Sequence, residues 1–209
     1  MSSATITTSA RLMNSTPQTE EQAMVRKVAV SSFLGNFIEW FDYASYSYFA
    51  TTIALVFFPT DNHTVAMLQT FGVFALSFIL RPIGALFWGS YGDKKGRKAA
   101  LAHSIMFMSG ASFLIGCLPS YSVIGVGAPI LLLLLRMVQG FSASGEYAGA
   151  ATFLGEYAPT SKRGIYCSLI PAFTAIGLLA GSTLATLMTA NMNSSAMVGW
   201  GWRVPFLLA

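Results

Sequence analysis

Residues 64–88 read TVAMLQTFGVFALSFILRPIGALFW, and residues 89–98 continue as GSYGDKKGRK. The first stretch carries a single charge, at Arg81. A helix needs about 20 consecutive apolar residues to cross the hydrocarbon core of a bilayer. The first stretch therefore predicts a transmembrane helix, and the basic, glycine-containing run after it predicts a loop at one membrane surface.

The composition of the whole chain agrees with this interpretation. Of its 209 residues, 54% are hydrophobic and only 10% are charged, whereas soluble domains carry about 25% charged residues. A soluble domain and a disordered chain are therefore excluded, and an integral membrane protein remains. The net charge of +4 comes from short basic clusters between apolar runs rather than from a basic stripe interleaved with aromatic residues. We therefore expect no nucleic-acid partner.

The apolar runs predict an all-α membrane bundle over residues 26–209, preceded by a disordered cytoplasmic tail over residues 1–25. Its expected spans are about 28–58, 64–88, 99–118, 129–157 and 164–190, with the start of a sixth at 202–209. Eight helical residues rise about 12 Å, against a hydrocarbon core of about 30 Å. We therefore expect the chain to be a fragment, or half of a larger protein, cut off early in its sixth helix.

The basic residues predict the orientation. Nine of the twelve lie on one side of the expected spans: Arg11, Arg26, Lys27, Lys94, Lys95, Arg97, Lys98, Lys162 and Arg163. Cytoplasmic loops carry the excess of Lys and Arg. The prediction is a multi-pass protein of the membrane with a cytoplasmic N-terminus.

Five ionisable residues lie inside the expected spans: Glu39, Asp42, Arg81, Arg136 and Glu146. Each costs about 2.5–3.5 kcal/mol at the bilayer centre, so they are expected to face the bundle interior or a water-filled cavity. With a rise of about 1.5 Å per residue, Glu39 and Arg81 come to similar depths, as do Asp42 and Arg136. The alternative to a transport role is an ion-pair network that only stabilises the bundle.

The acids outnumber the arginines, because three carboxylates face two guanidinium groups. The remaining acid has no fixed cation, so it could bind and release a proton near neutral pH, as proton-coupled transport requires. Asn36, Glu39, Tyr43 and Tyr46 share one face of the first span, and Gln139 and Glu146 share a face of the fourth. Such groups suit a small polar or cationic solute. Tyr46 and Tyr48 could equally belong to an aromatic belt at the outer interface.

No pattern in the chain indicates an enzyme. The sequence has no G-x-x-x-x-G-K-[ST] loop, and His63 and His103 are isolated, so neither ATP-driven transport nor a metal site is expected. Glycines at four-residue spacing, Gly145 with Gly149 and Gly177 with Gly181, favour close helix packing instead.

The run from Gly89 to Lys98 resembles the loop signature of the major facilitator superfamily, G-x-x-x-D-[RK]-x-G-R-[RK]. Other stretches resemble its metabolite–proton symporter branch: GNFIEWFDY at 35–43, RPIG at 81–84, RMVQG at 136–140, GEY at 145–147, EYAP at 156–159, KRG at 162–164 and WGWRVPF at 200–206. The resemblance covers the chain from about residue 27 to its end.

The resemblance implies a transporter of twelve helices in two six-helix halves, of which this chain holds the first half. It places Glu39, Asp42, Arg136 and Glu146 around the central cavity. It also implies a cytoplasmic gate around Asp93, Gly96 and Arg97, within the motif residues Gly89, Asp93, Lys94, Gly96, Arg97 and Lys98. The candidates for binding solute and coupling protons are Glu39, Asp42, Tyr43, Arg81, Arg136, Gln139 and Glu146.

The expected activity is proton-coupled symport of a small solute across the bacterial inner membrane, driven by the proton gradient without a cofactor. A zwitterion such as proline or glycine betaine is favoured, because the intramembrane charges are mostly acidic. An organic acid such as 2-oxoglutarate, citrate or shikimate is the alternative, since two arginines are enough to hold a carboxylate. A further alternative is a half that transports nothing without the missing C-terminal half.

Overall fold

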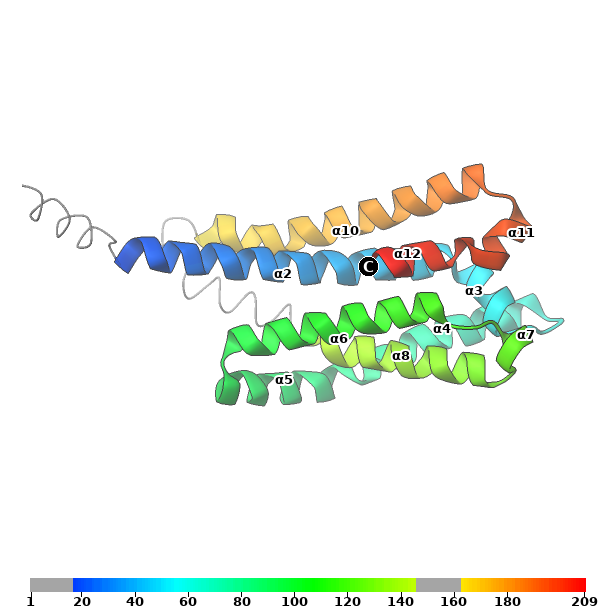
Figure 1. Ribbon diagram of the computed structural model, residues 1–209, viewed down its shortest axis with the longest axis horizontal. Coiled ribbons are helices and arrows are strands. Elements are labelled where there is room, and N and C mark those ends of the chain that lie inside the picture. Colours follow the sequence, from blue (N-terminus) through cyan, green and yellow to red (C-terminus); the bar gives the residue numbers. More distant parts are fainter. Residues whose placement is uncertain (1–16, 146–162) are drawn as a thin grey trace, which may run out of the picture.

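The described part of the chain, residues 17–145 and 163–209, consists of helices in the computed structural model (Figure 1). The first expected span corresponds to α2 (Pro17–Tyr48), which begins before it, and α3 (Ala50–Phe57). The second corresponds to α4 (His63–Ile79) and α5 (Arg81–Lys95), and the third to α6 (Arg97–Cys117). After the short α7 (Tyr121–Ile124), the described part of the fourth corresponds to α8 (Gly127–Ala143), and the fifth corresponds to α10 (Arg163–Asn191).

The chain then turns through α11 (Ser194–Ala196) and a π-helical turn, η2 (Met197–Gly201), into α12 (Arg203–Leu208). Among the described residues, three helices are long and apolar enough to cross a membrane: His63–Lys95, which joins α4 and α5, Arg97–Cys117, and Arg163–Asn191. Gly127–Ala143 is a shorter apolar helix. An all-α membrane chain is what the hydropathy pattern predicts.

The N-terminal helix is longer than the sequence indicates. Residues 1–25 are expected to form a disordered tail, but α2 begins at Pro17. The fixed φ of proline suits the first turn of a helix, and the acidic Glu20 and Glu21 follow near the positive end of the helix dipole. The polar composition of this segment hides these helix-start signals from a search for apolar spans.

Small residues bring the helix backbones together. α10 lies beside α2 (Figure 1), and a Cβ at Gly177 would come within 2.7 Å of the Phe37 carbonyl oxygen. At Gly181 it would come within 2.7 Å of the Ala44 side chain. Without a hydrophobic driving force between helices in lipid, such close approach provides the packing contacts. The prediction that Gly177 and Gly181 pack helices together is confirmed.

A second close contact joins α4 and α5 to α8. Cβ atoms at Gly140 and Gly84 would overlap the backbone carbonyl oxygens of Ser77 and Phe141, respectively. Gly145 lies against the Trp88 side chain, with a Cβ-to-Cβ distance of 2.8 Å for an added Cβ. Gly149 lies outside the described residues. This contact fixes α8 opposite the break between α4 and α5, which positions the polar side chains described below.

Candidate functional site

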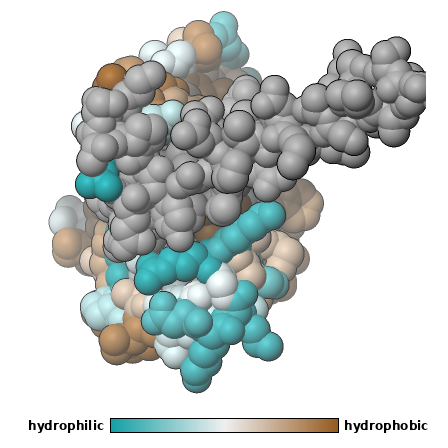
Figure 2. Space-filling model, turned by 90° about the vertical axis from the view of Figure 1, so that its left-hand side faces the viewer, coloured by the Kyte–Doolittle hydropathy of each residue, from teal (hydrophilic) through white to brown (hydrophobic). Residues whose placement is uncertain are grey.

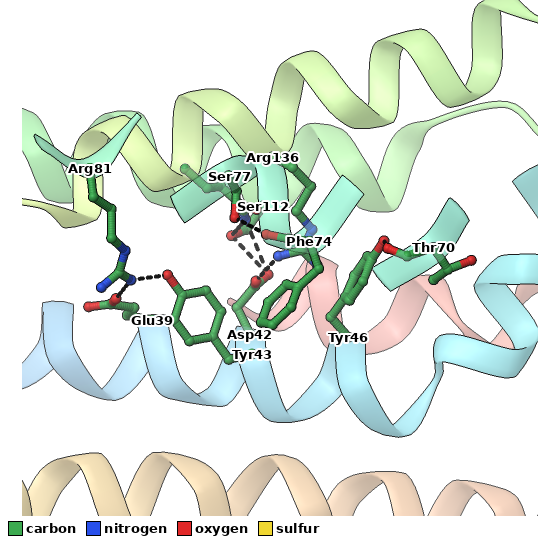
Figure 3. Close-up of polar contacts among 11 residues, drawn as sticks. Glu39, Asp42, Tyr43, Tyr46, Thr70, Phe74, Ser77, Arg81, Ser112 and Arg136 are labelled. Atoms are coloured by element: carbon green, nitrogen blue, oxygen red, sulfur yellow. Dashed lines mark hydrogen bonds and ion pairs between the residues drawn. The ribbon is translucent and has the colours of Figure 1, made fainter. Parts of the chain in front are cut away.

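The polar side chains of the interior gather along one helix, α2. Glu39 and Asp42 point from α2 toward the neighbouring helices, and each forms an ion pair with an arginine (Figure 3). Glu39 pairs with Arg81 of α5, and Asp42 pairs with Arg136 of α8. These are the two pairs that the depth estimate predicts, so this prediction is confirmed.

Arg81 owes its place to a local break in the second span. Pro82, at the second position of α5, has no backbone N–H to continue the hydrogen-bond ladder of α4. The guanidinium group donates through Nη2 to Glu39 Oε1 and to the Tyr43 hydroxyl oxygen. Its Cζ lies 4.7 Å from the Phe78 ring centre and 5.4 Å from that of Tyr43. The Arg81 side chain remains 30% exposed, whereas that of Glu39 is 4% exposed.

The second pair is enclosed more completely. The side chains of Arg136 and Asp42 are 1% and 4% exposed. Arg136 Nη1 donates to Asp42 Oδ2, while Gln139 Nε2 donates to Asp42 Oδ1 at 3.2 Å. Ser112 of α6 donates to the same Oδ1 at 3.4 Å and accepts from Gln139 Nε2 at 2.6 Å. Donors from two helices, α6 and α8, therefore hold the carboxylate of α2.

Two aromatic rings contact the Arg136 guanidinium. Its Cζ lies 3.9 Å from the Tyr46 ring centre and 5.5 Å from that of Phe206 in α12. Tyr46 is fixed in turn, because its hydroxyl donates to the Thr70 carbonyl oxygen of α4 at 2.9 Å. In a dry interior such cation–π contacts are worth about 2 kcal/mol. They help to hold the Arg136 guanidinium beside Asp42.

Several polar atoms of this cluster have no partner among the described residues. They are Nε and Nη2 of Arg136, Oε1 of Gln139 and Nε of Arg81. Buried donors and acceptors that lack partners are costly, about 1–3 kcal/mol each. The cluster around Asp42 therefore holds unused hydrogen-bonding capacity that a rearranged state could use.

Asn36, Glu39, Tyr43 and Tyr46, which the spacing predicts on one face of the first span, lie on two sides of α2. Glu39, Tyr43 and Tyr46 face α4, α5 and α8, as expected from their spacing. Asn36 instead faces α10, where its side-chain amide donates to the Ile170 carbonyl oxygen at 2.9 Å and to Thr174 Oγ1 at 2.8 Å. Asn36 therefore contributes to helix packing and not to the charged cluster.

Tyr46 and Tyr48 differ, although the sequence left both open as belt residues. Tyr46 is fully buried and Tyr48 is 60% exposed. Ser112 is the member of the cluster that the sequence analysis missed, because a serine in an apolar helix gives no signal of its direction. Glu146, which the count of acids leaves without a partner, lies outside the described residues.

The basic motif lies at the end of the bundle where α5 meets α6. Asp93, Lys94, Lys95, Arg97 and Lys98 are all exposed there, and Figure 2 shows hydrophilic residues gathered on this end. Arg97 Nη2 donates to Asp93 Oδ1 at 3.4 Å, from the start of α6 to the end of α5. Gly96 adopts a φ of +93°, a conformation that favours glycine, and it lets the chain turn from α5 into α6. Gly89 has open space around it.

The arrangement defines a class of protein. In the described part of the chain, helices pack around two ion pairs, three of these helices are long and apolar enough to cross a membrane, and no cluster of residues there could hold a metal. The fold matches the solved structure of the major facilitator proton:xylose symporter XylE bound to 6-bromo-6-deoxy-D-glucose, with a TM-score of 0.74 and 17% identity. The alignment covers 90% of this chain and 42% of that one. The chain thus has the fold of one half of a major facilitator transporter.

The sequence comparisons then give the family. Residues 27–209 match the model of the sugar (and other) transporter family, and the chain belongs to this family. It is 41% identical to the proline/betaine transporter of Salmonella typhimurium and 42% identical to the glycine betaine/proline/ectoine/pipecolic acid transporter OusA of Dickeya dadantii. Both alignments cover 90% of this chain and 38% of the relative. The chain is a transporter-family membrane protein, not an enzyme, and it spans under half the length of these relatives.

Proposed function

We propose that this chain forms the N-terminal half of a proton-coupled symporter for a small zwitterion such as proline or glycine betaine, in a bacterial inner membrane. The names of the relatives support the solute class, and their identity of 41–42% extends over the whole region that contains the cluster. The observation that carries the proton coupling is the buried Asp42–Arg136 pair. The side chain that bears its carboxylate is only 4% exposed.

Asp42 is the proton-binding group in this proposal. Protonation removes its charge and leaves the Arg136 guanidinium buried without a counter-ion, which is strongly unfavourable in a low-dielectric interior. The bundle then favours a conformation in which Arg136 meets water or another anion. A proton can thus bias the equilibrium between inward-open and outward-open states, because it binds the two states with different affinity.

Arg81 is the candidate for the carboxylate of the solute. It is the more exposed of the two intramembrane arginines, and it forms an ion pair with Glu39. In the proposal, the carboxylate of a zwitterion binds Arg81 and its cationic group binds Glu39, so that both charges of the pair keep a partner. The rings of Tyr43 and Phe78, which already contact a guanidinium, provide surfaces for a quaternary ammonium group.

Transport in this proposal requires a second half. Alternating access in transporters built from repeats arises when one repeat moves against another around a central site. Arg81 is 30% exposed in this half, and in the proposal it faces the cavity between the two halves. We therefore expect no uptake by the 209-residue chain alone.

The test is an uptake assay with a chimera. Residues 27–209 replace the aligned region of the Salmonella proline/betaine transporter, and cells without their own osmolyte carriers express the chimera or the chain alone. We expect uptake of labelled proline and glycine betaine by the chimera only, and its loss when a protonophore collapses the proton gradient. Immunoblots of membranes confirm equal amounts of both proteins.

Two results would contradict the proposal. Uptake of 2-oxoglutarate or citrate but not of proline or betaine would assign the cavity to organic acids. Uptake by the chain alone would show that one half is enough.

A further inference from the structure

Gln139 has an unusual position beside the Asp42 carboxylate. Its amide nitrogen donates twice, to Asp42 Oδ1 and to Ser112 Oγ, while its amide oxygen is buried without a partner among the described residues. The residue as a whole is 4% exposed. The donor end of the amide therefore faces the carboxyl group, and its acceptor end faces away from it.

The ionised state explains the observed direction of the amide. A carboxylate is an acceptor only, so both of its oxygens require donors. Arg136 supplies the donor to Oδ2, and Gln139 and Ser112 supply the donors to Oδ1. The amide nitrogen must therefore face Asp42 while the carboxyl group is charged.

The neutral state reverses this requirement at Oδ1. Oδ2 faces a guanidinium group, which has no acceptor, so a proton taken up from water is best placed on Oδ1. The new O–H then needs an acceptor where the Gln139 nitrogen now presents a donor. Ser112 can both donate and accept, but its oxygen already accepts from Gln139 at 2.6 Å.

We propose that the side-chain amide of Gln139 turns over when Asp42 is protonated, so that its oxygen accepts from the neutral carboxyl group. After this reversal the amide oxygen accepts from the neutral carboxyl group and from the Ser112 hydroxyl, while the amide nitrogen gives up its two present bonds and takes the buried place that the oxygen now holds. No covalent bond changes except the O–H bond that forms on Asp42. Gln139 acts as a positioning residue that provides a matching hydrogen bond to both charge states.

Among the described charged and titratable groups around Asp42, none is placed as Gln139 is to accept a hydrogen bond from its neutral carboxyl group. On α2 itself lie Glu39, which is paired with Arg81, and the phenols of Tyr43 and Tyr46. From α8 comes Arg136, a donor only, and from α6 comes the neutral Ser112. From α12 the aromatic Phe206 lies over Arg136.

The inference rests on the proposed role of Asp42, but its test needs no transported solute. The purified chain in lipid nanodiscs is taken through a pH step, and infrared difference spectra record the change. We expect a carboxylic-acid band that disappears in Asp42→Asn, accompanied by side-chain amide bands that disappear in Gln139→Met. Methionine has a similar length and neither donates nor accepts a strong hydrogen bond.

The midpoint of the carboxylic-acid band gives a second readout. Gln139→Met removes a hydrogen bond to the charged carboxylate and a weaker one to the neutral acid, so the neutral form gains relative to the charged form. We expect the midpoint to move to higher pH by about one unit. Ser142→Ala is the matched control on α8, since Ser142 is buried and its hydroxyl has no hydrogen-bond partner among the described residues, and its midpoint should equal that of the wild type.

Three results would overturn the inference. One is a wild-type spectrum with the acid band but without amide bands, and another is amide bands that persist in Gln139→Met. The third is a midpoint in Gln139→Met equal to that of Ser142→Ala. If uptake by the chimera fails while both infrared changes occur, the proposed transport is wrong and the amide reversal stands.

Discussion

Replacement of Arg136 by methionine tests the energetic account of the cluster. The guanidinium is 1% exposed, and its removal leaves the Asp42 carboxylate buried with hydrogen bonds from Ser112 and Gln139 alone. Breaking a buried pair by removing one partner costs about 3–5 kcal/mol. We therefore expect Arg136→Met to lower the free energy of unfolding by about that amount, a factor of at least about a hundred in the folding equilibrium.

Two further paired arginines, Arg81 and Arg97, set a scale for this loss. Arg81 is 30% exposed, so water can partly hydrate Glu39 after Arg81→Met, and we expect a smaller loss of about 1–2 kcal/mol. Arg97 is 58% exposed and its bond to Asp93 spans 3.4 Å, so Arg97→Met should cost less than about 1 kcal/mol. The order of the three variants follows from exposure alone.

The assay is equilibrium unfolding of the purified chain in mixed micelles with increasing denaturing detergent. The double variant Asp42→Asn with Arg136→Met should recover part of the loss, because no unpaired charge then remains. Acidic pH should likewise reduce the penalty of Arg136→Met, since protonation neutralises the orphaned carboxylate. Equal losses for Arg136→Met and Arg97→Met, or strict additivity in the double variant, would refute the reasoning.

Three further variants test separate contacts by the same unfolding assay. Gly140→Val should disrupt the bundle, because its side chain would overlap the Ser77 carbonyl oxygen, whereas Gly110→Val, with no atom within 4 Å of an added Cβ, should be tolerated; equal stability of the two would contradict the packing. Tyr46→Phe should lower the free energy of unfolding by about 1 kcal/mol, because the hydrogen bond to Thr70 is lost. Tyr46→Leu should lower it by at least about 2 kcal/mol more, because the ring contact with Arg136 is also lost. Equal losses for the two variants would count against the cation–π contact. Asn36→Leu should cost about 1–2 kcal/mol and loosen α10 from α2, as reported by faster hydrogen exchange in α10, and unchanged exchange would argue against this role.

The sequence predicts the long helices and the charge pairing for related reasons. In lipid, apolar length alone is a strong signal, and an ionisable residue inside such a length is tolerated in few places. Rise per residue then fixes its depth, which is why the sequence alone is enough to pair Glu39 with Arg81 and Asp42 with Arg136. The depth of a residue in the membrane follows from its position along its own helix and does not depend on which helices are its neighbours.

Direction around a helix is harder to predict than depth. Asn36 and Glu39 are three residues apart and share a broad face, yet the first contacts α10 and the second contacts α5. The arrangement of helices around α2 separates them, and hydropathy contains no information about that arrangement. Ser112 shows the same limit, because a serine hydroxyl can satisfy its own helix backbone and need not reach another helix.

The start of α2 illustrates a different limit. Apolar periodicity finds segments that are buried or lie in lipid, but the polar residues from Pro17 onward belong to neither class. Proline and acidic residues at a helix start are a local signal, which is easily missed where composition indicates a polar tail.

The most direct test of the proposed coupling is the movement of protons when solute is added. Cells that express the chimera are suspended without an energy source in weakly buffered medium, and the external pH is recorded as proline or glycine betaine is added. The account predicts a rise in external pH with the native Asp42. It predicts no rise with Asp42→Asn, which should still exchange labelled for unlabelled solute. An equal rise in pH with Asp42→Asn would contradict the central claim that protons enter through this carboxyl group.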